Sequence, residues 1–209
     1  GGEWGEYIVP FVEHLTIPLV TTFHTVLTQP NPKQREITEH IASRSEAIIV
    51  MMQQVAETLV KTYNIPQKKI IVIPHGVPDI PYDQTDTHKR KRKLSDKILL
   101  GNINLLDPNK GIEYALEAIA IIAKKYPNIL YAIIGQTHPD VLQREGEAYR
   151  NFLKKRVREL GIGEHVRFVN EYLRFSDLVS WLQAIDIYIT PYLEPQQVTS
   201  GALAYAIGA

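Results

Sequence analysis

The chain has 209 residues, of which 44% are hydrophobic and 22% charged, an ordinary globular balance. It contains no cysteine, which excludes disulfides and thiolate metal sites and permits a reducing compartment. Lys plus Arg and Asp plus Glu both number 23, and this zero net charge argues against a nucleic-acid-binding protein, which usually carries a basic excess.

The first part of the chain alternates between strand-like and helix-like segments. The segment from Asn31 has Asn31 as helix N-cap and Pro32 at the first helical position, a favourable helix start. The β-α-β-α-β order is typical of a parallel sheet covered by helices. The predicted elements are a strand at 18–24, a helix at 31–45, a strand at 47–52, a helix at 53–65 and a strand at 69–77.

The composition changes after this unit. Residues 79–96 contain proline, no apolar periodicity and the basic run HKRKRK at 88–93. Such a run can bind nucleic acid, but its position between two strands favours a solvated linker. We therefore expect an N-terminal domain over 1–78, a linker over 79–96 and a second domain over 97–209.

The alternation resumes in the second domain. We expect an α/β protein with two Rossmann-like parallel-sheet domains. No apolar run approaches the ~20 residues that a membrane-spanning helix needs. The predicted elements are strands at 97–103, 129–135, 165–170 and 186–191, and helices at 110–127, 147–162, 175–185 and from about 200.

Open α/β sheets bind ligands beyond the carboxyl ends of their strands. The segment GNINLLDPNKG, which follows Leu100 in the first predicted strand of the second domain, is a first candidate. Gly101 permits close backbone approach, and Asn102 is a neighbouring candidate for ligand contact. Lys110 is expected at a helix start, where free N–H groups already favour an anion such as a diphosphate. A solvated lysine in an ordinary first turn is the alternative, and the P-loop pattern GxxxxGK[ST] is absent.

Polar residues also follow the next two predicted strands. The run Gly135-Gln136-Thr137-His138 places a glycine and polar side chains at a strand end. His138 can reach a ligand there, or Asp140 can hold it in a structural role. Tyr172 can stack on a nucleobase, or it can pack in the core.

The last predicted helix begins with QQVTSG. Thr199 or Ser200 can cap it, Gly201 lets a ligand approach the backbone, and the first N–H groups form an anion site. Gln197 can donate a hydrogen bond to a sugar hydroxyl or a phosphate. An ordinary capped helix is the alternative.

One candidate lies in the first domain. His24 comes after Phe23 at the end of the predicted strand at 18–24, in TTFHT, and its imidazole can meet a sugar hydroxyl or a phosphate, or shuttle a proton. A structural hydrogen bond is the competing role.

Taken together, these segments resemble the retaining, nucleotide-sugar-dependent glycosyltransferases of family 4, which have the GT-B fold. TTFHT and IVIPHGV resemble the acceptor-side domain of that family. GNINLLDPNKGIEYALEAI, YAIIGQTHP and DIYITPYLEPQQVTSGALAYAIGA resemble its donor-side elements. The order and spacing of the segments are those of the family.

The resemblance implies transfer of a sugar from a UDP- or GDP-linked donor to a glycan or other hydroxyl acceptor, with retention. It implies Lys110 and His24 as catalytic residues, with donor contacts from the other candidates. It implies no cofactor and no metal, a cytoplasmic location, no nucleic-acid partner, and it leaves peripheral membrane contact open. Family members are longer, so we expect both domains to be incomplete in this chain and the chain alone to be inactive.

The sequence departs from the family pattern in two places. Asn102 to Asn104 stand where the family commonly has an arginine, and Gln197 and Tyr205 stand where it has two glutamates. These departures indicate a divergent subgroup. A non-hydrolysing sugar-nucleotide epimerase and a nucleotide-sugar-binding module without turnover remain the alternative functions.

Overall fold

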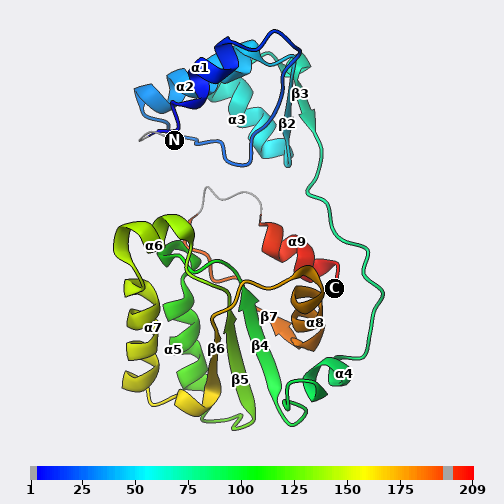
Figure 1. Ribbon diagram of the computed structural model, residues 1–209, viewed down its shortest axis with the longest axis vertical. Helices are drawn as coiled ribbons and strands as arrows, with labels where there is room; N and C mark the ends of the chain where they lie inside the picture. The colour runs from blue at the N-terminus through cyan, green and yellow to red at the C-terminus, as the bar shows by residue number, and fades with distance from the viewer. Residues whose placement is uncertain (1–3, 195–199) are drawn as a thin grey trace. The chain divides into compact units, whose positions relative to one another are not determined.

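The computed structural model describes residues 4–194 and 200–209, and the chain divides into two compact units (Figure 1). Unit 1 extends to Gly76, and unit 2 comprises Val77–Glu194 and Gly201–Ala209. Each unit has its own parallel sheet with helices packed on it, so the predicted α/β class with two parallel-sheet domains is confirmed. In the part of the chain that the structure describes, no helix is long and apolar enough to cross a membrane.

Unit 1 has a sheet with the strand order β1-β2-β3. Asn31 caps α2 as the sequence predicts: its side chain accepts a hydrogen bond from the Gln34 amide, and the Gln34 side chain accepts one from Asn31 N–H. Ile48 and Val50 of β2 are buried against α3. Its elements are α1 (Ile8–Glu13), β1 (Val20–Thr22), α2 (Pro32–Arg44), β2 (Ala47–Val50), α3 (Gln53–Tyr63), η1 (Gln67–Lys69) and β3 (Ile70–Val72).

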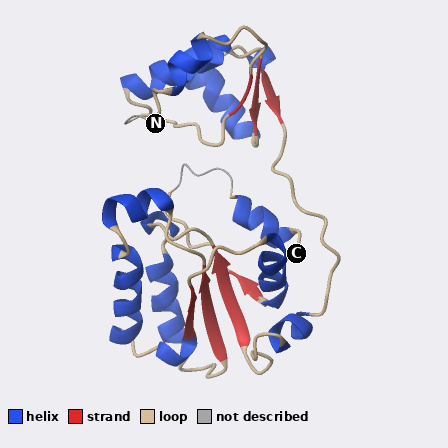
Figure 2. Cartoon of the chain, in the orientation of Figure 1, coloured by secondary structure: helices blue, strands red, loops and turns tan. Residues whose placement is uncertain are grey.

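Unit 2 has a parallel sheet with the strand order β6-β5-β4-β7. Figure 2 shows its strands running in one direction, so their carboxyl ends meet at one edge. Its elements are α4 (Thr85–Arg90), β4 (Ile98–Ile103), η2 (Pro108–Lys110), α5 (Ile112–Ile122), β5 (Ile129–Ile134), α6 (Pro139–Glu145), α7 (Ala148–Glu159), η3 (Gly163–His165), β6 (Val166–Val169), α8 (Phe175–Ala184), β7 (Ile187–Tyr188) and α9 (Gly201–Ile207).

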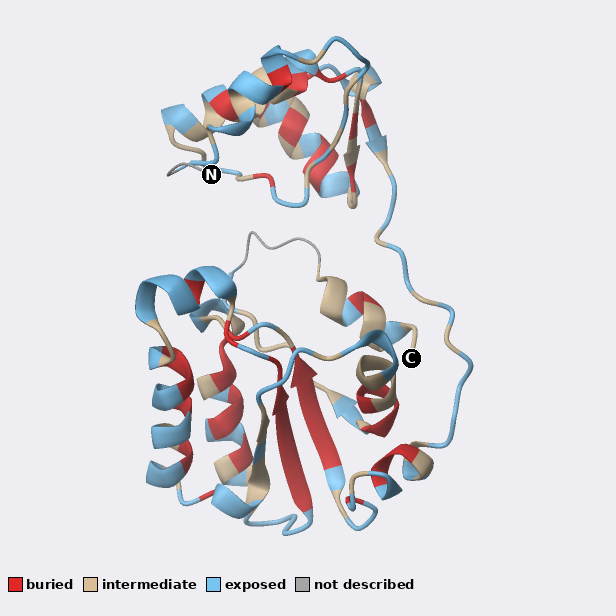
Figure 3. Cartoon of the chain, in the orientation of Figure 1, coloured by how far each residue is buried: buried red, intermediate tan, exposed pale blue. Residues whose placement is uncertain are grey.

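The sheet of unit 2 is covered on both faces. One apolar core lies between the sheet and α5 and α7, and a second lies between the sheet and α8 and α9. All six residues of β5 are buried (Figure 3), as expected for the inner strand of a parallel sheet. The chain leaves β4 toward α5 on one face and leaves β7 toward α9 on the other. This reversal makes the carboxyl ends of β4 and β7 the topological switch point, where open α/β sheets form a ligand crevice.

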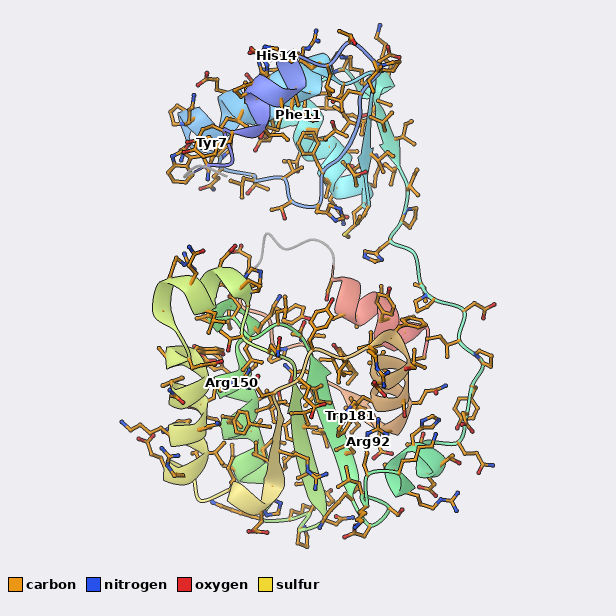
Figure 4. All side chains as sticks on the ribbon, in the orientation of Figure 1. Tyr7, Phe11, His14, Arg92, Arg150 and Trp181 are labelled. Carbon is orange, nitrogen blue, oxygen red and sulfur yellow. The ribbon has the colours of Figure 1, made fainter. Side chains whose placement is uncertain are left out.

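The segment predicted as a solvated linker contains α4, which packs on α8. Within the basic run, His88 and Lys89 are buried, and Lys89 Nζ lies 2.5 Å from Asp186 Oδ2. Arg92 lies over the Trp181 ring, 4.2 Å from its centroid (Figure 4). The expectation of a solvated run is therefore wrong for these residues, because carboxylate and aromatic partners from distant segments cover them.

Candidate functional site

The loops that follow β4 and β7 are held against each other at the switch point. Leu193 N–H donates a hydrogen bond of 2.9 Å to the carbonyl of Asn109. Gly111 has a φ of +61°, and a side chain there would place its Cβ 2.1 Å from the Pro191 carbonyl oxygen. Only glycine satisfies both the backbone angle and this close approach. The segment carrying Lys110 is thus fixed beside the segment that leads toward α9.

Lys110 lies in this pair of loops, but its position differs from the one predicted from the sequence. It closes η2, which Asp107 caps, whereas α5 begins at Ile112. The sequence predicts that the long helix starts at Lys110, whereas in the structure Lys110 ends a short 3-10 turn and α5 starts two residues later. Its Nζ lies 4.5 Å from the centroid of the Tyr192 ring, within cation–π range.

The surroundings of Lys110 affect its charge. Burial lowers the pKa of the Lys110 ammonium, and the attraction of Asp107 opposes this only in part. The pKa is lowered overall because the loss of solvation on burial disfavours the charged form more than the attraction of Asp107 favours it. An arriving anion would therefore stabilise the charged form.

A pocket of about 230 Å³ opens at the same edge of the sheet. This is smaller than the ~300–1,000 Å³ of a site that encloses a whole small-molecule ligand, so the pocket suits one part of a larger ligand. It is lined by Ile103, Asn104, Leu105, Gly135, Gln136, Glu171, Tyr172, Leu173, Leu178, Leu182, Ala202 and Tyr205. The lining thus combines three strand ends with α8 and α9.

Asn104 connects this pocket to Lys110. Its Oδ1 accepts a hydrogen bond of 2.9 Å from the Tyr192 hydroxyl, whose ring lies under the Lys110 ammonium. Asn104 Nδ2 is buried and has no hydrogen-bond partner among the residues that the structure describes. A buried donor without a partner is costly, and this one belongs to a side chain that lines the pocket.

The loop after β5 supplies another wall. Gly135 has a φ of +130°, and a Cβ there would lie 1.9 Å from the Asn104 carbonyl oxygen. Gly135 and Gln136 line the pocket.

Thr137 is buried and its hydroxyl donates to Glu147 Oε2 at 2.5 Å. His138 caps α6, with Nδ1 accepting a hydrogen bond from Asp140 N–H.

Gly101 and Asn102 lie within β4 rather than after it. A side chain at Gly101 would place its Cβ 2.6 Å from Ile185 Cδ1, so this glycine makes room for core packing. Asn102 is 1% exposed, and within the described ranges its Oδ1 has no hydrogen-bond partner. Neither residue lines the pocket, and their predicted contact with a ligand stays a prediction.

The structure places the remaining candidates as follows. Tyr172 is 80% exposed at the pocket, which excludes the core-packing alternative. Gly201 begins α9, directly after Ser200, and the next residue of the helix lines the pocket.

Gln197 and Thr199 lie outside the described residues. His24 is exposed directly after β1 in unit 1, whereas the pocket belongs to unit 2.

Two tyrosines of the switch point were missed in the sequence. Tyr188 Oη donates to the carbonyl of Ile103 at 3.1 Å and accepts from its amide at 3.3 Å. Burial raises the pKa of Tyr188 far enough to keep its hydroxyl protonated. Tyr192 holds Asn104 and lies under Lys110. Its position directly after a strand-ending proline, in TPY, is the signal that could have identified it.

Two family sequence models match the chain. The model of "Glycosyl transferases group 1" matches residues 83–196, which is more than half of the chain. The model of "Glycosyltransferase Family 4" matches residues 7–79.

Curated relatives include D-inositol 3-phosphate glycosyltransferases. The protein from Stackebrandtia nassauensis is 24% identical over 99% of this chain and 49% of its own length. The protein from Xylanimonas cellulosilytica is 26% identical over 86% of this chain and 45% of its own length. The chain therefore spans about half the length of these relatives.

Solved structures share the fold. Anabaena HepE in complex with UDP has a TM-score of 0.70 at 17% identity, covering 86% of this chain and 48% of its own. A UDP-forming α,α-trehalose-phosphate synthase from Burkholderia xenovorans has a TM-score of 0.73 at 13% identity, covering 97% of this chain and 54% of its own. At these identities the likeness concerns the fold.

Proposed function

The chain belongs to the glycosyl transferases group 1, and from this premise we propose that it serves the transfer of a sugar from a nucleoside-diphosphate donor to a hydroxyl acceptor. Membership confirms the family resemblance read from the sequence. We propose retention at the anomeric carbon, as in the family. UDP is the first nucleotide to test because HepE is described in complex with UDP, and GDP is the second.

One observation carries the proposal: the loops after β4 and β7 meet at the switch point, where Tyr192 and Asn104 connect Lys110 to the pocket. A departing nucleoside diphosphate develops negative charge, and preorganised donors aimed at such charge contribute about 3–4 kcal/mol each. We assign this role to the Lys110 ammonium and to the backbone N–H groups at Ser200 and Gly201. Burial lowers the pKa of Lys110 because it disfavours the charged ammonium. An anion beside the ammonium would favour that charged form.

The pocket would hold another part of the donor. Asn104 Nδ2 offers a buried donor without a partner in the described chain, and Gln136 adds a second polar group. Tyr172 is exposed at the pocket and can stack on a planar base. These features suit the nucleoside or the sugar, with the diphosphate toward Lys110.

The transfer step needs a proton acceptor for the attacking hydroxyl. The proposal gives this role to the donor's own phosphate and requires neither a cofactor nor a metal. His24 stays a predicted catalytic residue, and replacement by alanine in a turnover assay of the complete enzyme tests it: unchanged turnover would make the residue structural. Acceptor identity, cytoplasmic location and peripheral membrane contact stay predictions.

Calorimetric titration of the chain with UDP, GDP and uridine tests the donor site. The proposal expects one nucleoside diphosphate to bind, and uridine to bind more weakly because it lacks the diphosphate. Incubation of the complete enzyme with the matching sugar nucleotide and simple hydroxyl acceptors, followed by NMR of the anomeric proton, tests retention. Failure of both diphosphates to bind would remove the proposed function, and an inverted product would remove the proposed stereochemistry.

A further inference from the structure

A buried polar network lies behind the loop that follows β5. Arg150 of α7 is 2% exposed (Figure 4). Its Nη2 donates to the Gly135 carbonyl at 3.0 Å and to Thr137 Oγ1 at 3.4 Å. Its Nε donates to Glu147 Oε2 at 3.0 Å, and Thr137 donates to the same oxygen. One guanidinium thus holds the first and third residues of the loop and their carboxylate partner.

The loop that this network holds has an unusual shape. Gly135 adopts a φ of +130°, and its Cα faces the backbone of Asn104 with no room for a side chain. Leu106 N–H donates to the Gln136 carbonyl, and His138 N–H donates to the Leu106 carbonyl. These bonds extend the pairing of β4 and β5 beyond the strand ends. They fix one side of the loop, and Arg150 fixes the other.

The network contains two charged groups near neutral pH, the Glu147 carboxylate and the Arg150 guanidinium. The hydrogen bond from Thr137, and then the bond and charge of Arg150, lower the pKa of the Glu147 carboxyl. Glu147 is therefore ionised and compensates the buried guanidinium. Arg150 Nη1 is nevertheless buried without a hydrogen-bond partner in the described part of the chain. Replacing a buried ion pair by apolar residues is often neutral or stabilising, so fold stability alone is a poor reason for this arrangement.

We propose that Arg150 is a positioning residue that fixes the Gly135–Thr137 loop in the conformation that binds the nucleoside-diphosphate donor. Arg150, Thr137 and Glu147 do not line the pocket, whereas Gly135 and Gln136 do. Arg150 therefore acts on the ligand through the loop. The inference rests on the proposed function and adds to it the groups that shape one wall of the site.

Matched variants separate positioning from stability. Arg150→Met keeps an unbranched apolar stem and removes the guanidinium with its charge and donors. Arg150→Lys keeps one charge, and Thr137→Val removes one hydroxyl at constant volume. Arg156→Met is the control, since Arg156 lies on the same helix and its side chain is 32% exposed, with ion pairs to Glu117 and Glu159. UDP and GDP affinities are measured by calorimetry below the unfolding midpoint of every variant, with hydrogen exchange of the Leu106 and His138 amides, whose hydrogen bonds fix the loop.

We expect Arg150→Met to weaken diphosphate binding about 10–100-fold and Thr137→Val about 3–10-fold, from the loss of charged and neutral hydrogen bonds respectively. Arg150→Lys should recover part of the loss, and Arg156→Met should bind like the wild type. The amides of Leu106 and His138 should exchange faster in Arg150→Met. If Arg150→Met does not fold, Thr137→Val carries the test with the same readouts.

Folded variants that bind the diphosphate with wild-type affinity, even if they melt earlier, would overturn the positioning role and leave the proposed function intact. A wild-type chain that binds neither UDP nor GDP would instead overturn the proposed function, and this inference with it.

Discussion

Two lysines lie at opposite ends of the sheet in unit 2 and have different partners. Lys89 lies at the amino ends of the strands, where it contacts Asp186 at 2.5 Å and donates to the Lys97 carbonyl. Asp186 also accepts from the Leu99 amide. Lys110 lies at the carboxyl ends, over the ring of Tyr192.

The difference shows what each charge does. A buried cation that faces a carboxylate of its own chain connects two elements, here α4 and the start of β7. Burial lowers the pKa of Lys110, and the attraction of Asp107 opposes this in part, so an anion close to the ammonium would favour its charged form. We propose that the first lysine stabilises the fold and that the second binds a ligand. The predictions below test this division.

The largest effect is expected at Lys89. Lys89→Met leaves the Asp186 carboxylate without its ammonium, and breaking such a pair should lower the free energy of unfolding by about 3 kcal/mol. Urea denaturation measures it, with Lys155→Met as control because the Lys155 side chain is 69% exposed. UDP affinity should change less than about twofold. A loss of affinity without a loss of stability would reverse the division between the two lysines.

A second effect concerns the loops that hold Lys110. Gly111→Ala places a Cβ in a left-handed backbone and 2.1 Å from the Pro191 carbonyl oxygen. We expect about 2–3 kcal/mol of destabilisation and weaker UDP binding. Gly161→Ala is the control, because Gly161 has a similar positive φ of +67° and no atom within 4 Å of an added Cβ. Equal losses in the two variants would show that backbone angle, and not the contact between loops, decides the effect.

A third effect is the dependence of UDP binding on pH. If the protonated Lys110 ammonium binds the diphosphate as proposed, affinity should be full below the lowered pKa of Lys110 and should fall as the pH rises through it. A bound diphosphate raises that pKa, so binding should take up protons in this range. Calorimetry in buffers of different ionisation enthalpy measures the uptake, which we expect to accompany a fall of about tenfold in affinity. The same uptake in Lys110→Met would assign it to another group.

The smallest effect is expected at Tyr192. Tyr192→Phe keeps the ring under Lys110 and removes the hydroxyl that donates to Asn104. UDP affinity should fall by about 1 kcal/mol, the net value of one hydrogen bond. Tyr192→Leu, which also removes the ring, should lose more. Equal affinities in the two variants would show that the ring contributes nothing.

The alternation of strands and helices could be read from the sequence because apolar runs and helix starts are local signals. Asn31 and Pro32 specify the start of α2 without help from other segments. The order of the strands brings the loops after β4, β5 and β7 to one edge, so the neighbourhood of Lys110 and Gly135 could be predicted as well.

Long-range partners account for what the sequence could not predict. The local sequence around Lys89 predicts a solvated side chain, whereas in the structure Lys89 pairs with Asp186, 97 residues away in the sequence. The predicted ligand contact of Gly101 stays a prediction, but the sequence does not indicate that Ile185 occupies the space of a side chain there. The role of Arg150 depends on the loop of Gly135 and Thr137, and no local pattern in α7 indicates this.

The central claim is that Lys110 recognises the diphosphate of the donor. The most direct test is calorimetric titration of the wild type and of Lys110→Met with UDP and with uridine at neutral pH. We expect Lys110→Met to weaken UDP binding about 10–100-fold, the value of hydrogen bonds to a charged group, and to leave uridine binding and stability unchanged. Equal UDP affinities in the two proteins, or an equal loss for UDP and uridine, would contradict the claim.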